Sequence, residues 1–340
     1  MRLFQLFCVL LFSLMCFCHG HLVARGFNEP WHRIQWMGQT PRPEAQTAFL
    51  MLSNRPMDFT RSHFATERSD TNCWQYLYVV EEDSTWKIYP FYTLSEALKS
   101  MPNKDWVIYT EGMGKTFYGN LRRASAMRQT YQVNVLLFDY ASMASDLGIM
   151  QNFRMSMRNA ALGYAAYFRM MDTIRMQRST FKGQTLSLFF HSMGNLLLEA
   201  LVQSGLTQKW NAQPFIDNLI LNAPCINRNG HHRWFNQIRW AKRKWVHYNR
   251  ADTKLNGAAL LSGNRKLGSK PKYPFERSTY YIDFNRACER THNYFLDIPE
   301  RSFRRSSLIR AYFEVLLHGK VPDVSKWQKS KVVGWEAPPA

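Results

Sequence analysis

The sequence predicts an α/β fold with a mostly parallel central sheet covered by helices on both faces. Segments typical of strands alternate with segments whose apolar residues recur at helical spacing. The stretch 133–139 (VNVLLFD) is an apolar run, which is typical of a strand buried on both faces. In the stretch 185–202 (TLSLFFHSMGNLLLEALV), an apolar run turns into a helical pattern within four residues. Strands that alternate with helices in this way favour parallel pairing.

The first 20 residues predict a secretory signal peptide. Arg2 precedes a mainly apolar run that ends at Phe17, and small residues at 18 and 20 suit cleavage before His21. The run is shorter than the roughly 20 apolar residues of a membrane span, although an uncleaved anchor is the alternative. We therefore expect a secreted or periplasmic protein whose mature chain, residues 21–340, forms a single domain.

The region 21–104 is expected to supply N-terminal strands, and the region 105–296 the catalytic core. Residues 21–47 show no clear period and are expected to be irregular. Strands are predicted at 48–52, 73–80, 86–89, 105–110, 133–139, 185–190, 216–221, 245–248 and, as the last strand, 279–284. Helices are predicted at 94–101, 117–131, 195–202 and 307–317, with one long helix over 150–176 and a small cap helix over 228–244.

The turn at residues 191–194 has the features of a nucleophile elbow, a sharp strand-to-helix turn that presents a serine above the end of the sheet. Ser192 would be the exposed residue, and Gly194 would let the new helix pass close to a strand. The usual pattern is G-x-S-x-G, and here Phe190 occupies its first position, which normally holds a small residue. A chance S-x-G after a buried strand is the alternative interpretation.

A serine nucleophile needs a base, and the base needs an orienting acid. In folds with such an elbow, the order along the chain is serine, acid, histidine, with the last two on loops after later strands. Asp252 follows the strand predicted at 245–248, and His292 follows the strand predicted at 279–284. An ordinary surface aspartate and an ordinary loop histidine are the alternatives. His191 adjoins the serine but is expected to point away from it.

The motifs FHSMGN, YNRADTKL and THNYF, at 190–195, 248–255 and 291–295, resemble those of the alpha/beta hydrolases of unknown function. The resemblance spans roughly residues 105–296 and implies an α/β-hydrolase fold with serine hydrolase activity. It implies that Ser192 is the nucleophile, Asp252 the acid and His292 the base. By the same resemblance, the main-chain N–H groups of Met193 and Met113 form the oxyanion hole. Besides Phe190, the chain departs from the family at Glu111, where histidine normally precedes Gly112.

Two classes of function follow from these observations. The first is an exported serine hydrolase that cleaves an ester or related acyl bond of a small molecule. The second is a catalytically silent hydrolase fold that binds an anionic partner, because the chain carries a net charge of +19. The segment 228–250 would carry that binding, since its basic residues interleave with tryptophans: Arg228, Arg233, Trp234, Arg239, Trp240, Lys242, Arg243, Lys244, Trp245 and Arg250. A solvated cap helix with inward-packed tryptophans is the alternative, and no specific nucleic-acid binding is expected.

Cysteine usage points to no metal site and no disulfide framework. Only Cys73, Cys225 and Cys288 remain after the signal peptide, without a C-x-x-C spacing. Cys225 and Cys288 both follow predicted strands, so a bridge between them is one hypothesis. No motif for a cofactor or metal is present, and the sequence leaves the oligomeric state open.

Overall fold

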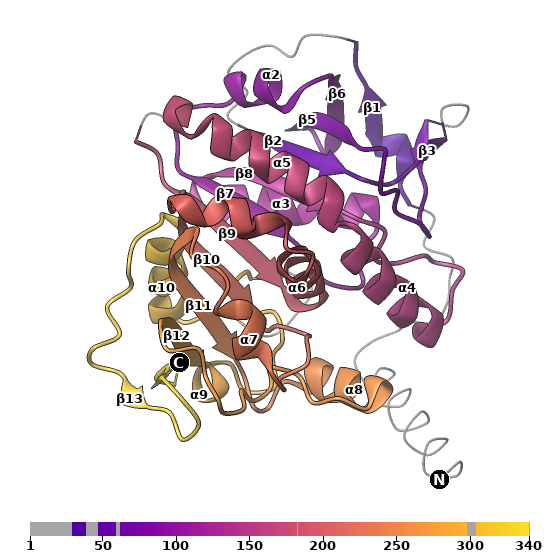
Figure 1. The fold of residues 1–340 in the computed structure, drawn as a ribbon. Helices are drawn as coiled ribbons and strands as arrows, with labels where there is room; N and C mark the ends of the chain where they lie inside the picture. Colours follow the sequence, from indigo (N-terminus) through magenta and orange to yellow (C-terminus); the bar gives the residue numbers. More distant parts are fainter. Residues whose placement is uncertain (1–28, 39–46, 59–61, 182, 298–303, 340) are drawn as a thin grey trace.

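The computed structural model describes residues 29–38, 47–58, 62–181, 183–297 and 304–339, and is organised around one large twisted sheet (Figure 1). The signal peptide predicted at 1–20 lies outside these residues. The sheet has twelve strands in the order β1-β6-β5-β2-β8-β7-β9-β10-β11-β12-β14-β13. Every neighbouring pair from β2 through β8 and β7 to β14 is parallel. The predicted α/β class with a mostly parallel sheet is therefore confirmed.

The strands at the centre of the sheet are buried along their whole length. The continuous series of parallel pairs consists of β2 (Ala48–Ser53), β8 (Asn134–Asp139), β7 (Trp106–Thr110), β9 (Leu186–His191), β10 (Ile216–Asn222), β11 (Ala241–Tyr248), β12 (Thr279–Asp283) and β14 (Trp335–Glu336). The others are β1 (Ile34–Trp36), β5 (Gln75–Glu82), β6 (Thr85–Phe91) and β13 (Gln328–Lys329), with a separate hairpin of β3 (Met57–Asp58) and β4 (His63–Phe64).

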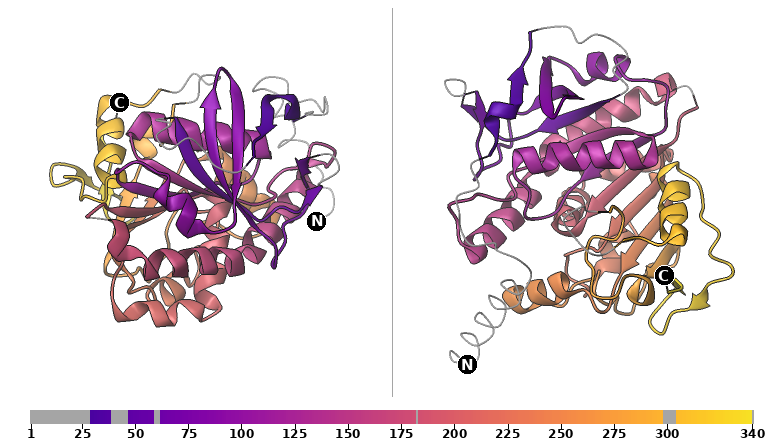
Figure 2. Two further views of the ribbon diagram at one scale, coloured as in Figure 1. Left: turned by 90° about the horizontal axis from the view of Figure 1, so that it is seen from above. Right: turned by 180° about the vertical axis from the view of Figure 1, so that it is seen from behind.

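Helices cover both faces of the sheet (Figure 2). One core cluster joins α3 (Phe117–Tyr131) and α10 (Ser307–Leu317) to the sheet. The opposite cluster joins α2 (Leu94–Lys99), α5 (Tyr164–Met176), α6 (Asn195–Gln203) and α7 (His231–Phe235). Val107 and Tyr109 of β7 belong to the first cluster, and Trp106 and Ile108 to the second. This alternation is what a strand between two helical layers requires.

The helix predicted over 150–176 is two helices, α4 (Ile149–Leu162) and α5, separated at Gly163. A Cβ atom at this position would lie 3.0 Å from the Phe138 ring and 3.1 Å from the Leu197 side chain. The absence of a side chain thus lets the chain pass close to β8 and α6 at the junction. Glycine is also a poor helix former, so the interruption falls at the weakest point of the pattern.

The cap helix predicted over 228–244 is wrong. Only His231–Phe235 is helical, and strand β11 already begins at Ala241. The side chains of Trp234 and Phe235 belong to the same core cluster as the leucines of α6. This short helix therefore packs over a face of the sheet instead of forming a lid.

The basic segment 228–250 does not form an aromatic stacking surface, because Trp234, Trp240 and Trp245 are all buried. Several of its cations are paired within the fold. Lys242 lies 2.8 Å from Asp217, and Lys244 lies 3.0 Å from Glu276. Of the alternative interpretation, a cap helix with inward-packed tryptophans, only the inward packing of the tryptophans is present. Their burial removes the main support for a stacking site.

Further differences concern the two ends of the chain. The segment 21–47, expected to be irregular, contributes β1, which pairs in parallel with β6. Strand β12 is not the last strand, because β14 adds to it in parallel and β13 pairs with β14. Two-residue strands carry no periodic signal in a sequence.

Cys225 and Cys288 are both buried free thiols, so the hypothesis of a bridge between them is wrong. Cys225 follows β10 and Cys288 ends α9 (Asn285–Cys288) after β12, with β11 between the two strands. Two strand spacings amount to about 10 Å, whereas a disulfide needs Cα atoms within about 7 Å. Within the ranges that the structure describes, no helix is both long and apolar enough to cross a membrane.

Candidate active site

The turn between β9 and α6 is a sharp elbow with Ser192 at its apex. Ser192 has φ +51°, a left-handed conformation that costs a non-glycine residue about 1–2 kcal/mol. The Asn195 amide holds the turn, since its Nδ2 donates to the carbonyl oxygens of Phe190 at 3.1 Å and Ser192 at 2.9 Å. The main-chain N–H of Cys225 also donates to the Ser192 carbonyl at 3.0 Å. Hydrogen bonds from two segments of the chain thus hold one strained residue.

Two glycines allow the elbow to lie against the end of β7. A Cβ atom at Gly194 would lie 2.7 Å from the Glu111 carbonyl oxygen and 2.8 Å from that of Thr110. A Cβ atom at Gly112 would lie 2.6 Å from the Cβ of Ser192. The close approach expected at Gly194 is therefore present, and the neighbour is strand β7.

Phe190 fits without displacing the elbow, because its ring lies inside the core. The side chain is fully buried, and its ring centroid lies 5.5 Å from that of Tyr167 on α5. Ser192 keeps its positive φ two residues later. A large residue at the first position of the pattern is thus accommodated by the helical layer over this face.

Asp252 and His292 come together from two separate loops. The Nδ1 atom of His292 lies 2.6 Å from Oδ2 of Asp252, whose side chain is fully buried. Oδ1 of Asp252 accepts from the N–H groups of Lys254 and Leu255, so the same carboxylate caps α8 (Thr253–Ser262). An ionised Asp252 therefore fixes the proton of His292 on Nδ1 and leaves Nε2 free.

His292 also lies beside the elbow. Its ring centroid is 4.8 Å from that of His191, the residue before Ser192. Within the residues that the structure describes, no hydrogen bond joins His292 to Ser192 Oγ. The structure thus brings together Asp252 and His292 next to the elbow, without closing the last contact of a triad. Such contacts are often long in free enzymes and tighten when substrate binds.

The two main-chain groups expected at an oxyanion hole belong to Met193, which follows Ser192, and to Met113, which follows Gly112. Met193 N lies 3.1 Å from where a Cβ atom on Gly112 would stand, so a side chain at position 112 would cover it. The N–H of Gly112 is engaged by its neighbour, since it donates to Oε1 of Glu111 at 2.8 Å. Among the described residues, the N–H of Met113 has no hydrogen-bond partner. Met193 and Met113 therefore remain the candidate donors.

Glu111, which replaces the usual histidine, is a buried anion held by Arg123. Arg123 Nε lies 3.1 Å from Oε2 of Glu111, and the Tyr109 hydroxyl donates to the same oxygen at 2.5 Å. Burial alone would raise the pKa of the Glu111 carboxyl, but the nearby cations Arg123 and Lys115 and the hydrogen bond from Tyr109 act against it, and the pKa is lowered to about 2. Glu111 is therefore ionised at neutral pH.

Arg123 also reaches the loop that carries His292. With the Asn293 amide in its hydrogen-bonding orientation, the Asn293 side-chain oxygen accepts from both terminal nitrogens of Arg123, at 2.7 and 3.0 Å. One guanidinium thus joins the loop after β7 to the residue next to His292. Nothing in the sequence marks Arg123 for this role, because it is one of several arginines on a helix.

A chain of neutral polar groups runs beneath the elbow from His191 to α10. Asn222 Nδ2 donates to His191 Nδ1 at 3.1 Å, and Asn222 Oδ1 lies 3.1 Å from Nδ1 of His247. Nε2 of His247 lies 2.8 Å from the Tyr312 hydroxyl. Burial lowers the pKa of His191 well below its usual value and that of His247 to about 3. Both imidazoles are therefore neutral and serve as packed hydrogen-bonding groups.

Within the described ranges, no cluster of three or more histidine, cysteine, aspartate or glutamate residues could hold a metal ion. Cys225 is buried, and burial raises the pKa of its thiol to about 11. A thiol in this state is a poor nucleophile at neutral pH. Ser192 is the nucleophile candidate that the geometry leaves at this edge of the sheet.

A family model described as "Alpha/beta hydrolase of unknown function (DUF900)" matches residues 92–279. The match includes the elbow and Asp252 and ends before His292. No curated protein and no solved structure matches the chain. The matched region covers more than half of the 340 residues, and the sheet and helices around it have the expected arrangement. The chain therefore belongs to the alpha/beta hydrolases of unknown function.

Proposed function

We propose that this protein is a serine hydrolase that cleaves an ester or related acyl bond by means of Ser192, Asp252 and His292. The observation that supports this most directly is the 2.6 Å contact between Asp252 and His292 beside a serine at φ +51°. A buried carboxylate on Nδ1 and a free Nε2 form the arrangement that a general base requires.

The reaction proceeds in two half-reactions. Nε2 of His292 takes the Ser192 proton while Oγ attacks the acyl carbon, and the N–H groups of Met193 and Met113 stabilise the oxyanion. The imidazolium then protonates the departing alcohol as its bond to the acyl carbon breaks. Water, deprotonated by His292, attacks the acyl-enzyme, which releases the acid and returns the proton to Ser192.

Labelling with a fluorophosphonate probe tests the proposal, because the probe reacts only with an activated serine. We expect the native protein to be labelled and to hydrolyse simple nitrophenyl esters. Ser192→Ala should abolish labelling and lower kcat by a factor on the order of 10⁶. Its melting temperature should stay close to that of the native protein.

The matched control is Ser204→Ala, since Ser204 caps the C-terminus of the same helix far from the elbow and bonds only main-chain groups of Leu201 and Leu206. An unlabelled native protein, or a Ser192→Ala variant as active as the native protein, would leave the second class of function: a catalytically silent fold that binds an anionic partner.

We infer export from the N-terminal sequence, with cleavage after Gly20. Intact-mass measurement of protein recovered outside the cytoplasm checks this. A chain that begins at His21 is the expected result, whereas one that still begins at Met1 would indicate an uncleaved anchor.

A further inference from the structure

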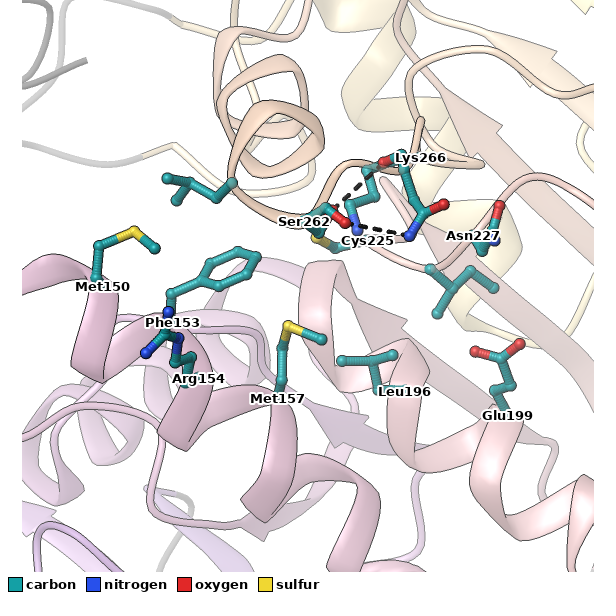
Figure 3. A pocket seen from close by; sticks show the side chains of 13 residues that line it. Met150, Phe153, Arg154, Met157, Leu196, Glu199, Cys225, Asn227, Ser262 and Lys266 are labelled. Atoms are coloured by element: carbon teal, nitrogen blue, oxygen red, sulfur yellow. Dashed lines mark hydrogen bonds between the residues drawn. The ribbon is translucent and has the colours of Figure 1, made fainter. Parts of the chain in front are cut away.

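A pocket of about 350 Å³ lies at the edge of the sheet beside the elbow (Figure 3). Its volume falls within the range of small-molecule sites. Side chains of α4 and α6 lie opposite Cys225, Ser262 and Lys266 in the view of Figure 3. The apolar part of the lining consists of Met150, Phe153, Met157, Leu196, Ile226 and Leu261. Such a lining suits a hydrocarbon chain, since methionine side chains adapt to irregular apolar ligands.

The pocket adjoins Ser192 through two elements. Leu196 follows the serine by about one helical turn, and Cys225 donates its main-chain N–H to the Ser192 carbonyl at 3.0 Å. Glu199, farther along α6, also lines the pocket. Glu199 lies seven positions after Ser192, which corresponds to roughly 10 Å along a helix. The lining includes residues on both sides of the elbow, so a chain bound in the pocket would extend along α6 away from the elbow.

Lys266 is a buried cation at the pocket, and no hydrogen-bond or ion-pair partner of its ammonium is found among the described residues. The residue is only 4% exposed, and it lines the pocket. In the part of the chain that the structure describes, its Nζ makes no hydrogen bond and no ion pair. A buried ammonium is costly unless a polar or charged group satisfies it. Since Lys266 lines the pocket, an anionic group of a ligand bound there would pair with its ammonium.

The charged residues around Lys266 favour binding of an anionic group. Burial raises the pKa of Glu199 to about 7, against the opposing effect of Lys266, so this carboxyl is partly neutral near pH 7. Arg154 lines the pocket as a second cation and is exposed. The pocket thus has two cations against one weakened acid, which favours an anion.

We propose that this pocket binds the acyl chain of the substrate and that Lys266 binds an anionic group at the far end of that chain. This inference rests on the proposed serine hydrolase activity. It assigns the substrate class as esters of medium-chain acids that carry a second acidic group, of which half-esters of dicarboxylic acids are the simplest.

The test compares two 4-nitrophenyl esters of equal chain length, the octanoate and the suberate half-ester. We expect kcat/KM of the native protein to favour the half-ester by about tenfold or more, the value of one charge-assisted hydrogen bond. Lys266→Met should abolish this preference. Lys270→Met, which removes the same charge from an exposed residue nearby, should leave the preference and the activity unchanged.

A binding measurement keeps the inference separate from the proposed reaction. Titration calorimetry on Ser192→Ala should detect tighter binding of suberate monomethyl ester than of methyl octanoate, although this variant cannot turn either over. Met157→Trp places a larger side chain in the pocket and should weaken binding of both compounds. This variant tests the pocket independently if Lys266→Met does not fold. Equal affinity of the two compounds, or a preference that persists in Lys266→Met, would overturn the inference. If the fluorophosphonate probe does not label the native protein but suberate monomethyl ester still binds more tightly than methyl octanoate, only the hydrolase proposal is overturned.

Discussion

Asp252 has two tasks, and each uses a different oxygen atom. Oδ2 holds His292, and Oδ1 caps α8 through the N–H groups of Lys254 and Leu255. The same residue therefore contributes to the proposed chemistry and to the stability of a helix. The two contributions can be separated by choosing the replacement.

Asp252→Asn keeps an oxygen for the helix cap but removes the negative charge beside His292. We expect kcat to fall by about 10⁴, as when the orienting acid of a triad is made neutral, with little change in melting temperature. Asp252→Ala should lose the cap as well and destabilise the protein by about a further 1 kcal/mol. Ester hydrolysis and urea denaturation measure the two effects, and equal stability of the two variants would contradict the role of the cap.

The buried pair of Glu111 and Arg123 should make stability depend on pH. The folded-state pKa of Glu111 is about 2, below the ordinary value of 4.5. Its stabilising contribution is therefore complete above about pH 4.5 and is lost as the pH falls toward 2. The shift corresponds to about 3 kcal/mol.

Glu111→Gln should remove this part of the pH dependence and destabilise the protein at neutral pH, because Arg123 would lose its buried partner. Urea unfolding at pH 3 and pH 6 checks the expectation. Glu67→Gln, a change of the same type at an exposed residue, serves as the control. An unchanged difference between the two pH values in Glu111→Gln would show that another group causes it.

At the scale of elements, the elbow depends on how closely α6 approaches β7. The contact partners of a side chain at Gly194 are the carbonyl oxygens of Thr110 and Glu111, which are part of the backbone and cannot turn aside. The same contacts position the loop that carries Gly112 and Met113. The junction of two elements therefore controls the shape of the proposed oxyanion site.

Gly194→Ala should destabilise the protein by about 1–3 kcal/mol, the usual cost of overpacking, and should lower ester hydrolysis more than stability alone explains. Gly119→Ala in α3 is the matched control. A Cβ atom there meets only side-chain atoms at 3.4 Å or more, and alanine is the better helix former. Melting temperatures and kcat/KM of both variants give the comparison, and a fully active, stable Gly194→Ala would refute the packing argument.

At the scale of the whole molecule, the C-terminal segment protects one edge of the sheet. Strand β14 covers β12, and the N–H of Ala337 donates to the Asp283 carbonyl at 2.8 Å. Arg250, two residues before Asp252, lies 3.0 Å from both Asp283 and Glu336. The end of the chain thus supports the loop that carries the proposed acid.

Truncation after Lys326 should lower the free energy of unfolding by about 2 kcal/mol or more, since at least two hydrogen bonds and the packing of Trp335 are lost. The uncovered edge of β12 should also promote association between molecules. Urea denaturation and size-exclusion chromatography measure these effects. Truncation after Ala337, which keeps both strands, is the control and should behave like the full chain.

The sequence alone determined the α/β class, the elbow and most of the strands and helices around it. Helices 117–131 and 307–317 match α3 and α10 to the residue, because their apolar period is regular and Thr116 and Ser306 cap them. The sequence also named Asp252 and His292, whose side chains the structure places 2.6 Å apart. Their catalytic roles and that of Ser192 stay predictions.

Only the tertiary structure decided the features that depend on contacts between distant segments. The division of 150–176 at Gly163 depends on close contacts with Phe138 and Leu197. The end of 228–244 is a strand instead of a helix because β11 pairs with β10. Contacts between distant segments also join Glu111 to Asn293 through Arg123. Contacts of the same kind bury Lys266 at the pocket that α6 lines. Local periodicity records the faces of an element, but not which remote residue meets each face.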